Sequence, residues 1–254
     1  MISDCQLNKK IKSIIEKIAF PKNLLYKQDM KFNQPISVII PAFNEEKNIG
    51  RVLAVLKDIN WIDEIIVVDD HSQDKTAKIV EDLKLSNLTL IKNKVNLGKG
   101  GALVAGIKKT KYNLLLFLDA DLIDLKEEHL LKILNPIIFT READLVLGVF
   151  AIKYLRKNMA TKIANRAFPS ITGQRAIWKK NLPKLSQLKN SRYSVDYIMT
   201  KHVPKKRRLI VKLEGLSQMI KEEKGDLAKA LRLRIKMYQQ ILQEIQKQNK
   251  KSPN

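Results

Sequence analysis

The chain contains the run NLLLFLDAD at residues 113–121, in which five consecutive apolar residues stop at two aspartates. A short apolar run without polar alternation is typical of a strand buried on both faces. Residues two apart in an extended segment project to the same side, so Asp119 and Asp121 are expected to point the same way. Neighbouring carboxylates repel one another unless a cation lies beside them. The run therefore predicts a buried strand with an acidic, cation-binding end; the alternative is a solvated loop that carries two acids.

Similar runs recur on both sides of this segment, separated by stretches with helical spacing. We expect strands over 36–40 (closed by Pro41), 64–68, 88–91, 113–118 and 143–149, and helices over 48–57, 76–85, 101–109 and 125–134. This alternation predicts an α/β fold with a mostly parallel central sheet and helices on both faces. Ligands of such sheets bind beyond the carboxyl ends of the strands, so the polar residues there are the candidate site.

The two ends of the chain do not follow the alternation. Residues 1–34 are expected to form an N-terminal helical segment and residues 35–150 the α/β part. Residues 151–254 are expected to complete one composite domain and to end in a basic helical extension. The elements expected there are helices over 151–168, 194–201 and 221–247 and a strand over 208–213. The last helix is expected to pack on the body or on a second copy of the chain, as in a homodimer, in preference to a membrane.

The net charge of +22 is unevenly distributed along the 254 residues. Residues 1–34 carry +4, residues 35–150 carry −2, and residues 151–254 carry +20. Such a field favours an anionic partner, which can be a phosphate compound, nucleic acid or an acidic membrane surface. The alternative is a lysine-rich solvated face. Nucleic acid is disfavoured because aromatic residues are only 6% and do not interleave with the basic ones.

The cysteine content and the hydropathy of the chain indicate the cellular compartment in which the protein is expected. The single cysteine, Cys5, excludes an intramolecular disulfide and a zinc ribbon. No run approaches the ~18 apolar residues of a membrane-spanning helix, and the charged N-terminus is unlike a secretory signal. We expect a cytoplasmic protein.

Three further strand ends carry unusual polar residues. Residues 98–101 (GKGG) precede a helix, whose free N–H groups can bind phosphate while Lys99 neutralises it; an ordinary glycine-rich turn is the alternative. Asp69 and Asp70 follow a strand, and helix capping by Asp74 or Ser72 does not account for both. A carboxylate there can accept an N–H of a nucleotide base. Residues 45–46 (EE) can be plain first-turn acids.

Taken together, four segments resemble the family 2 glycosyltransferases, which have the GT-A fold. They are SVIIPAFNEEKNIG (37–50), IIVVDDHSQDKT (65–76), NLGKGGALVAGI (96–107) and LLLFLDADL (114–122). ITGQRAI (171–177) and GLSQMIKEEKG (215–225) are similar to the acceptor loop and terminal region of small soluble members. The nearer relatives resemble glucosyl-3-phosphoglycerate synthases and polyprenyl-phosphate sugar transferases.

The resemblance implies a UDP- or GDP-sugar donor and a divalent cation, Mg²⁺ or Mn²⁺. The donor residues it implies are Pro41, Phe43 and Glu45 at the nucleoside, Asp70 at the base, Lys99 and Gly100 at the pyrophosphate, Asp119 at the ribose and Asp121 at the cation. Lys99 and the cation then stabilise the leaving nucleoside diphosphate.

On the acceptor side, Asp196 lies where many inverting relatives have their catalytic base; the alternative is that Ser194 caps a helix and Asp196 is a first-turn acid. Gly173, Gln174 and Arg175 are expected to border the sugar and acceptor, and Arg175 suits a carboxylate or phosphate. The basic C-terminal part favours an anionic acceptor. Residues 205–208 (KKRR) can touch membrane phosphates or form a solvated turn.

Two positions depart from the family pattern. His71 stands where members usually have glycine, and Gln218 stands where many have a metal-binding histidine. An amide oxygen is a poorer ligand, so a cation bound by Asp121 and Gln218 is expected to be held more weakly. A glycosyltransferase-like protein with weakened chemistry is therefore kept as an alternative, beside a basic anion- or nucleic-acid-binding module.

Overall fold

The structure is a computed structural model that describes residues 32–151 and 171–218, with residues 239, 240, 242, 243 and 246. The chain divides into two units, Met1–Lys31 and Phe32–Asn254, and all the described residues lie in the second. The helical segment expected over 1–34 and the helices expected over 151–168 and 221–247 lie wholly or mainly outside the described residues. In the part of the chain that is described, no helix combines the length and apolar character needed to cross a bilayer.

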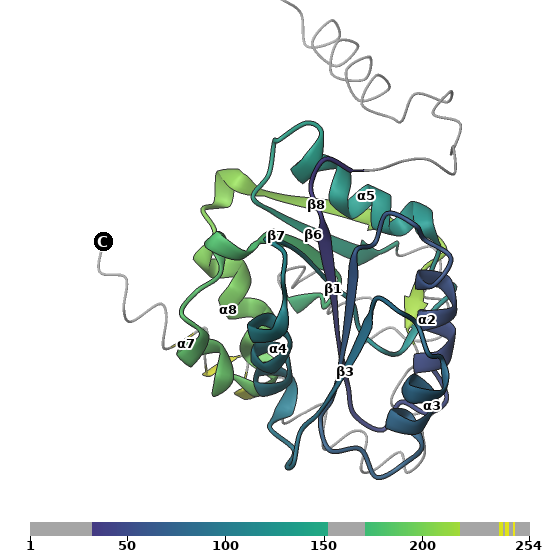
Figure 1. Ribbon diagram of the computed structural model, residues 1–254. Helices are drawn as coiled ribbons and strands as arrows, with labels where there is room; N and C mark the ends of the chain where they lie inside the picture. The colour runs from purple at the N-terminus through teal and green to yellow at the C-terminus, as the bar shows by residue number, and fades with distance from the viewer. Residues whose placement is uncertain (1–31, 152–170, 219–238, 241, 244–245, 247–254) are drawn as a thin grey trace, which may run out of the picture. The chain divides into compact units, whose positions relative to one another are not determined.

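A seven-stranded sheet forms the centre of the second unit, with the strand order β3-β2-β1-β4-β7-β6-β8 (Figure 1). The strands are β1 (Ile36–Ala42), β2 (Glu64–Asp69), β3 (Leu88–Lys92), β4 (Leu114–Phe117), β6 (Leu145–Phe150), β7 (Arg175–Trp178) and β8 (Arg208–Leu213). Pairing is parallel throughout except at β7, which is antiparallel to both neighbours. The prediction of a mostly parallel α/β sheet is confirmed.

Helices cover both faces of the sheet (Figure 1). They are α2 (Ile49–Leu56), α3 (Thr76–Asp82), α4 (Gly98–Lys109), α5 (Glu127–Ile138), α7 (Leu185–Lys189) and α8 (Val195–His202). Alternate strand residues such as Ile39, Leu115 and Phe117 pack in one core cluster with residues of α4, α7 and α8. Their neighbours Val38 and Leu116 are equally buried and, by the period of two, face the opposite side.

β1 runs two residues further than the sequence predicts, because Pro41 lies inside the strand. β1 pairs with β4 as far as Ile39, and beyond it pairs with β2 alone. Proline has no N–H to donate, so it is tolerated where one side of the strand is unpaired. The strand end is thereby extended to Ala42 without a break in the ladder.

β7 is absent from the sequence-based prediction. Its four residues begin at Arg175, which pairs with Phe117 of β4 and Leu147 of β6. A run this short has no usable period, and its partners lie far away in the sequence. The parallel strands β4 and β6 bring their last residues to one edge of the sheet. Because β7 is antiparallel to them, it brings its first residue, Arg175, to that edge.

A two-stranded ladder lies beside this sheet, formed by β5 (Leu122–Ile123) and β9 (Ser217–Gln218). His129 anchors the approach to β9. Its Nδ1 accepts the N–H of Lys126 at 3.1 Å, and its Nε2 donates to the carbonyl of Glu214 at 2.8 Å. The fully buried ring thus ties the start of α5 to the segment that carries Gln218.

Replacing glycine by alanine is expected to change the free energy of unfolding in opposite directions at two helix positions. A Cβ on Gly106 of α4 would lie 2.7 Å from Ile39 Cγ2 and 3.2 Å from Val68 Cγ2. We expect Gly106→Ala to lower the free energy of unfolding by about 1–3 kcal/mol through overpacking. Gly50→Ala in α2 meets Ile79 Cγ2 at an ordinary 3.5 Å and should raise it by about 0.5–1 kcal/mol. Urea unfolding measures both, and equal signs would contradict this packing.

A second prediction concerns pH. Arg207 donates two hydrogen bonds to the Asp144 carboxylate, from Nε at 3.0 Å and from Nη2 at 2.9 Å. The bond from Arg207 lowers the pKa of Asp144 and outweighs the opposing effect of burial. A carboxyl group with a lowered folded-state pKa adds stability above its ordinary pKa of ~3.9 and loses it as pH falls through the lowered value. Arg207→Met should therefore lower the urea midpoint slightly at pH 7, and this difference should shrink below about pH 4. A difference that persists in acid would show that the pair is not its cause.

Candidate functional site

Lys99, near the start of α4, joins two carboxylates that are remote in the sequence. Its Nζ donates to Oδ1 of Asp119 and to Oδ2 of Asp196, both at 2.8 Å. Asp119 follows β4, and Asp196 lies in the first turn of α8. Side-chain exposures of 22%, 16% and 6% place the three groups mostly out of solvent. The structure thus brings together three residues that the sequence predicts for one site.

The electrostatics of this bridge keep its members charged. Burial lowers the pKa of Lys99, but the charges and hydrogen bonds of Asp119 and Asp196 outweigh it and raise the pKa above its ordinary value. Burial likewise raises the pKa of Asp119, while Lys99, the Gln174 hydrogen bond and Arg175 together hold it below the ordinary value. An ammonium and a carboxylate therefore persist side by side at neutral pH.

Gln174 and Gly173 support Asp119. Gln174, which is 1% exposed, donates from Nε2 to Oδ2 of Asp119 at 2.7 Å, and its own Oε1 accepts from Thr172 at 2.8 Å. A Cβ on Gly173 would lie 2.2 Å from both oxygens of Asp119, so only glycine leaves room for this carboxylate. The two residues predicted at the acceptor thus contact the residue predicted at the ribose.

Arg175 is fully buried, with 0% exposure, so its guanidinium has no surface for an acceptor. It contacts Asp196 instead, and it donates to the carbonyl of Thr172. Burial lowers the pKa of Arg175, against the opposing charges of Asp196 and Asp119. The prediction of a direct forked contact with the acceptor does not fit this placement.

Asp196 is not a plain first-turn acid. Ser194 makes no capping bond to α8, and its hydroxyl donates to the carbonyl of Ser191 at 2.8 Å. The Asp196 carboxylate faces Lys99 and Arg175. The capping alternative is wrong for Ser194, because its hydroxyl accepts no N–H from the first turn of α8.

Asp70 binds the beginning of α4. Its carboxylate accepts the N–H of Leu97 at 2.9 Å and of Gly98 at 2.7 Å, and also the Asn93 amide at 2.8 Å. Part of the N–H cluster expected to hold phosphate is therefore bound by Asp70. A carboxylate has about four acceptor positions, so a base contact by Asp70 stays a prediction.

Gly100 has a packing reason for being glycine. A Cβ there would lie 2.3 Å from the carbonyl oxygen of Leu188 and 2.7 Å from Ser191 Oγ. The glycine lets α4 approach α7 and the 3₁₀ turn η4 (Arg192–Ser194). Its contact with a pyrophosphate stays a prediction.

The expected parallel projection of Asp119 and Asp121 is wrong. A turn at residues 120–121 follows β4, so the segment is not extended. Asp119 faces Lys99, while Oδ1 of Asp121 accepts from Nε2 of Gln218 at 2.7 Å. The β5–β9 ladder fixes this second contact, since it pairs Leu122 with Gln218.

The loops after β1 and β2 lock together. The N–H of Asn44 donates to Ser72 Oγ at 2.9 Å, and that of Glu45 donates to Thr76 Oγ1 at 2.7 Å. The Glu45 carboxylate accepts from Asn48 at 3.0 Å. Because α2 starts at Ile49, residues 45–46 precede the helix, and the first-turn alternative is wrong.

Two residues of these loops are notable. Phe43 is 45% exposed, as expected of an aromatic side chain available to a ligand. His71 has φ of 68°, a left-handed conformation that costs a non-glycine residue about 1–2 kcal/mol. This explains why glycine is common at that position of the family pattern. Nothing in the structure explains why histidine is present.

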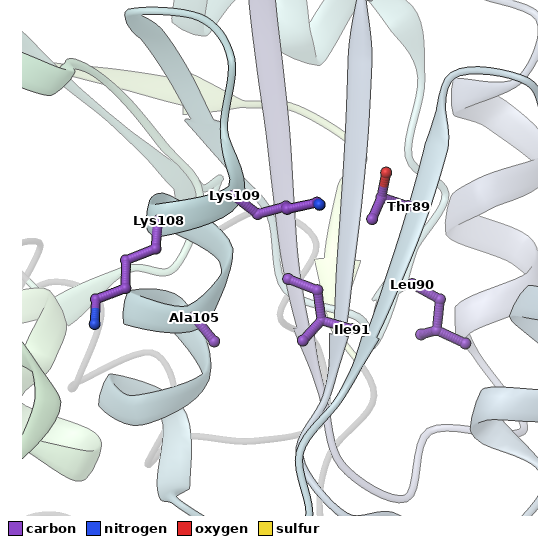
Figure 2. Close-up of a pocket in the computed structure, with 6 residues that line it drawn as sticks. All are labelled: Thr89, Leu90, Ile91, Ala105, Lys108 and Lys109. Carbon is purple, nitrogen blue, oxygen red and sulfur yellow. The ribbon is translucent and has the colours of Figure 1, made fainter.

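Two hollows at the surface of the described residues have similar volumes. One of about 350 Å³ is lined by residues of the loops after β1 and β2, including Asn44, Asn48 and Gln73. The other, of about 410 Å³, lies between β3 and α4, where Figure 2 shows its six lining residues: Thr89, Leu90, Ile91, Ala105, Lys108 and Lys109. Neither hollow is lined by any of the predicted site residues.

The basic residues 205–208 lie away from the site. They precede or begin β8, whose first residue is at the edge of the sheet opposite the strand ends. Arg207 is tied to Asp144, and Arg208 Nε donates to the carbonyl of Val203 at 2.6 Å. A membrane contact through this cluster stays a prediction, and it would not border the acceptor residues.

The donor set suits a cation that shares its ligands with a diphosphate. Both oxygens of Asp119 are engaged by Lys99 and Gln174, whereas Asp121 and Gln218 offer one carboxylate and one amide. Within the described ranges no group of three His, Cys, Asp or Glu residues could hold a metal ion by itself. Mg²⁺ is commonly bound by one or two carboxylates plus substrate phosphates, so Asp121 fits such a cation.

The sequence profile of glycosyl transferase family 2 matches residues 37–199. The chain belongs to this family. The family resemblance and the GT-A fold predicted from the sequence are therefore confirmed.

Among the relatives of this family 2 member is the undecaprenyl-phosphate 4-deoxy-4-formamido-L-arabinose transferase of Photorhabdus laumondii. It is 32% identical over 160 residues, which cover 57% of this chain and 47% of that protein. The chain spans about half or less of the length of the curated relatives it matches.

Two solved structures share the fold. Glucosyl-3-phosphoglycerate synthase from Mycobacterium tuberculosis, in complex with Mn²⁺, uridine diphosphate and glucosyl-3-phosphoglycerate, is 20% identical with a TM-score of 0.62, covering 83% of this chain and 78% of that one. Mannosyl-3-phosphoglycerate synthase from Rubrobacter xylanophilus is 16% identical with a TM-score of 0.66, covering 85% and 75%. At these identities the likeness shows the fold alone.

Sequence reasoning missed three supporting residues. Asn93 holds Asp70, Thr172 holds Gln174, and Thr200 Oγ1 donates to the carbonyl of Asp196 at 2.8 Å. Asn93 directly follows β3, so the strand-end rule could have found it. Thr172 and Thr200 have no such pattern.

The Lys99 bridge predicts a large loss of stability on substitution. Lys99→Met leaves two mostly buried carboxylates without their shared cation, and we expect the free energy of unfolding to fall by about 3–5 kcal/mol. Lys78→Met is the matched control, since Lys78 pairs with Asp82 at the same 2.8 Å but with both side chains exposed, and it should change little. Urea unfolding at pH 7 compares them, and equal losses would contradict the buried bridge.

Proposed function

We propose that this family 2 chain transfers a sugar from a nucleoside diphosphate sugar to a hydroxyl of an anionic acceptor, with the help of a divalent cation. The observation that carries the proposal is the Lys99 bridge, which holds one carboxylate from the strand-end segment and one from α8 around a single ammonium. A protein of the same fold is in complex with Mn²⁺ and uridine diphosphate, which supports a nucleotide donor and a divalent cation for this chain.

The donor half is proposed to lie along the ends of β1, β2 and β4. Phe43, with Pro41 and Glu45, flanks the nucleoside, Asp70 the base and Asp119 the ribose, while Gly100 and Lys99 border the pyrophosphate. Lys99 is suited to the last role because its ammonium already lies among carboxylates that a diphosphate would compete with. A cation held by Asp121, Gln218 and the diphosphate supplies positive charge against the leaving group.

Asp196 is proposed as the base of an inverting transfer. Its carboxylate takes the proton of the acceptor hydroxyl as the new bond from that oxygen to the anomeric carbon forms. The bond from the anomeric carbon to the diphosphate oxygen breaks, and the electron pair leaves with the nucleoside diphosphate. Such proton transfer contributes roughly 10²–10⁴-fold in rate.

The acceptor is proposed to carry phosphate. Residues 151–254 have a charge of +20, and a relative and a structural neighbour act on, or bind, phosphate compounds of two kinds. Gly173 and Gln174 border the acceptor side in this proposal, while Arg175 lies behind them.

A thermal-shift panel tests the donor and the cation together. UDP, GDP, UDP-glucose and GDP-mannose are each added with and without Mn²⁺. A ligand at 100 times its Kd stabilises by about 2.7 kcal/mol. We expect one base to be preferred and Mn²⁺ to enlarge the shift. Asp121→Ala should abolish the enlargement, whereas Asp124→Asn, at an exposed acid three residues away, should retain it.

Gln218→His completes the panel. An imidazole is a better ligand than an amide, so the Mn²⁺-dependent shift should grow. An Asp121→Ala protein that keeps its Mn²⁺-dependent shift would refute the cation site.

Two outcomes would contradict the donor proposal itself. It fails if no nucleotide stabilises the chain. RNA binding that survives 200 mM salt would favour the nucleic-acid alternative, because binding to phosphate alone weakens steeply at that salt concentration.

A further inference from the structure

Arg175 lies directly behind the carboxylate that is proposed as the base. It is the first residue of β7, and its pairing with Phe117 and Leu147 holds its backbone in the centre of the sheet. With 0% exposure, its guanidinium can act only through protein groups.

The guanidinium holds Asp196 at two points. Nη1 donates to the backbone carbonyl of Asp196 at 2.7 Å, and Nη2 lies 3.1 Å from its Oδ1. Nη1 also donates to Thr200 Oγ1 at 3.2 Å, which itself binds that carbonyl. Main chain and carboxylate of Asp196 are thus fixed by one rigid planar group.

The two carboxylate oxygens have different partners. Oδ1 faces Arg175 inside the protein, and Oδ2 faces Lys99, the more exposed of the two cations. A diphosphate that attracts the Lys99 ammonium therefore removes one partner of Asp196 and leaves the other in place.

A gain in folding stability does not by itself account for the buried pair of Arg175 and Asp196. Buried ion pairs can often be replaced by apolar residues at little or no cost to stability, because desolvation offsets the attraction. The planar guanidinium of Arg175 contacts both the carbonyl and the carboxylate of Asp196, and it therefore fixes the orientation of that side chain. A lysine, as a single point charge, would not fix this orientation.

We propose that Arg175 is a positioning residue for Asp196. It holds Oδ2 toward Lys99 and the strand ends, so that the carboxylate is already aimed when the acceptor hydroxyl arrives. This inference rests on the proposed function, in which Asp196 is the base, and replaces the predicted contact of Arg175 with the acceptor.

The test compares Arg175→Lys, Asp196→Asn and the double variant in the full chain. The donor is UDP-glucose or GDP-mannose, whichever stabilises the parent, and the acceptor is 3-phosphoglycerate, a polyprenyl phosphate or water. Arg175→Lys should lower kcat by about 10²-fold, the size of effect that a small misplacement causes. The Kd of the nucleoside diphosphate should stay within about threefold, because only the transfer step is affected.

The double variant gives the decisive result. If Arg175 acts through Asp196, the double variant should be no slower than Asp196→Asn alone, because residues that act as a unit are not additive. Losses that multiply would overturn the proposal, and so would an Arg175→Lys protein with the parent's kcat. Arg207→Lys, at an arginine–carboxylate pair on the opposite edge, should leave kcat unchanged.

The outcomes also separate this inference from the proposed function. A parent with no turnover, or an Asp196→Asn variant with full turnover, refutes the base and with it the role of Arg175. An inactive Asp196→Asn beside a fully active Arg175→Lys refutes the positioning role alone. Should Arg175→Lys fail to fold, Arg175→Met/Asp196→Asn, which removes both charges of the pair, is compared with Asp196→Asn in the same way.

Discussion

A buried ammonium that must be neutralised organises the candidate site. Lys99 cannot lie at 22% exposure without counter-charges, and it obtains them from the segment after β4 and from α8. This requirement draws the second half of the chain against the first. Gly100, which lets α4 approach α7 and η4, makes the approach sterically feasible. Charge pairing and close helix packing therefore act at the same place, where the segment after β4, the start of α4 and the start of α8 meet.

The sequence was sufficient for the parallel part of the fold. β1, β2 and β4 are continuous apolar runs, and α2, which follows β1, and α4, which precedes β4, have helical spacing, so local periodicity determines each element within a few residues. Candidate residues at strand ends were found for the same reason: parallel strands bring their carboxyl ends to one edge. The order and spacing of four motifs added the family, which the profile match confirms.

What the sequence did not predict depends on partners far along the chain. β7 exists because β4 and β6 lie on either side of it. Arg175 was expected at the acceptor because its chemistry suits anions, yet that same fork is used inside the protein on Asp196. The turn at residues 120–121 sends Asp119 and Asp121 to different partners, which residue spacing alone does not reveal. Side-chain direction, more than residue identity, was the missing information.

The reversed direction of β7 has a consequence for how such a protein can diversify. β6 ends and β7 begins at the same edge of the sheet, so the chain that joins them leaves and returns beside the site. Lengthening a connection of this kind costs only about 0.6 kcal/mol for each doubling. A change of length at this single junction can thus be accommodated while the half of the molecule that precedes it is inherited unchanged.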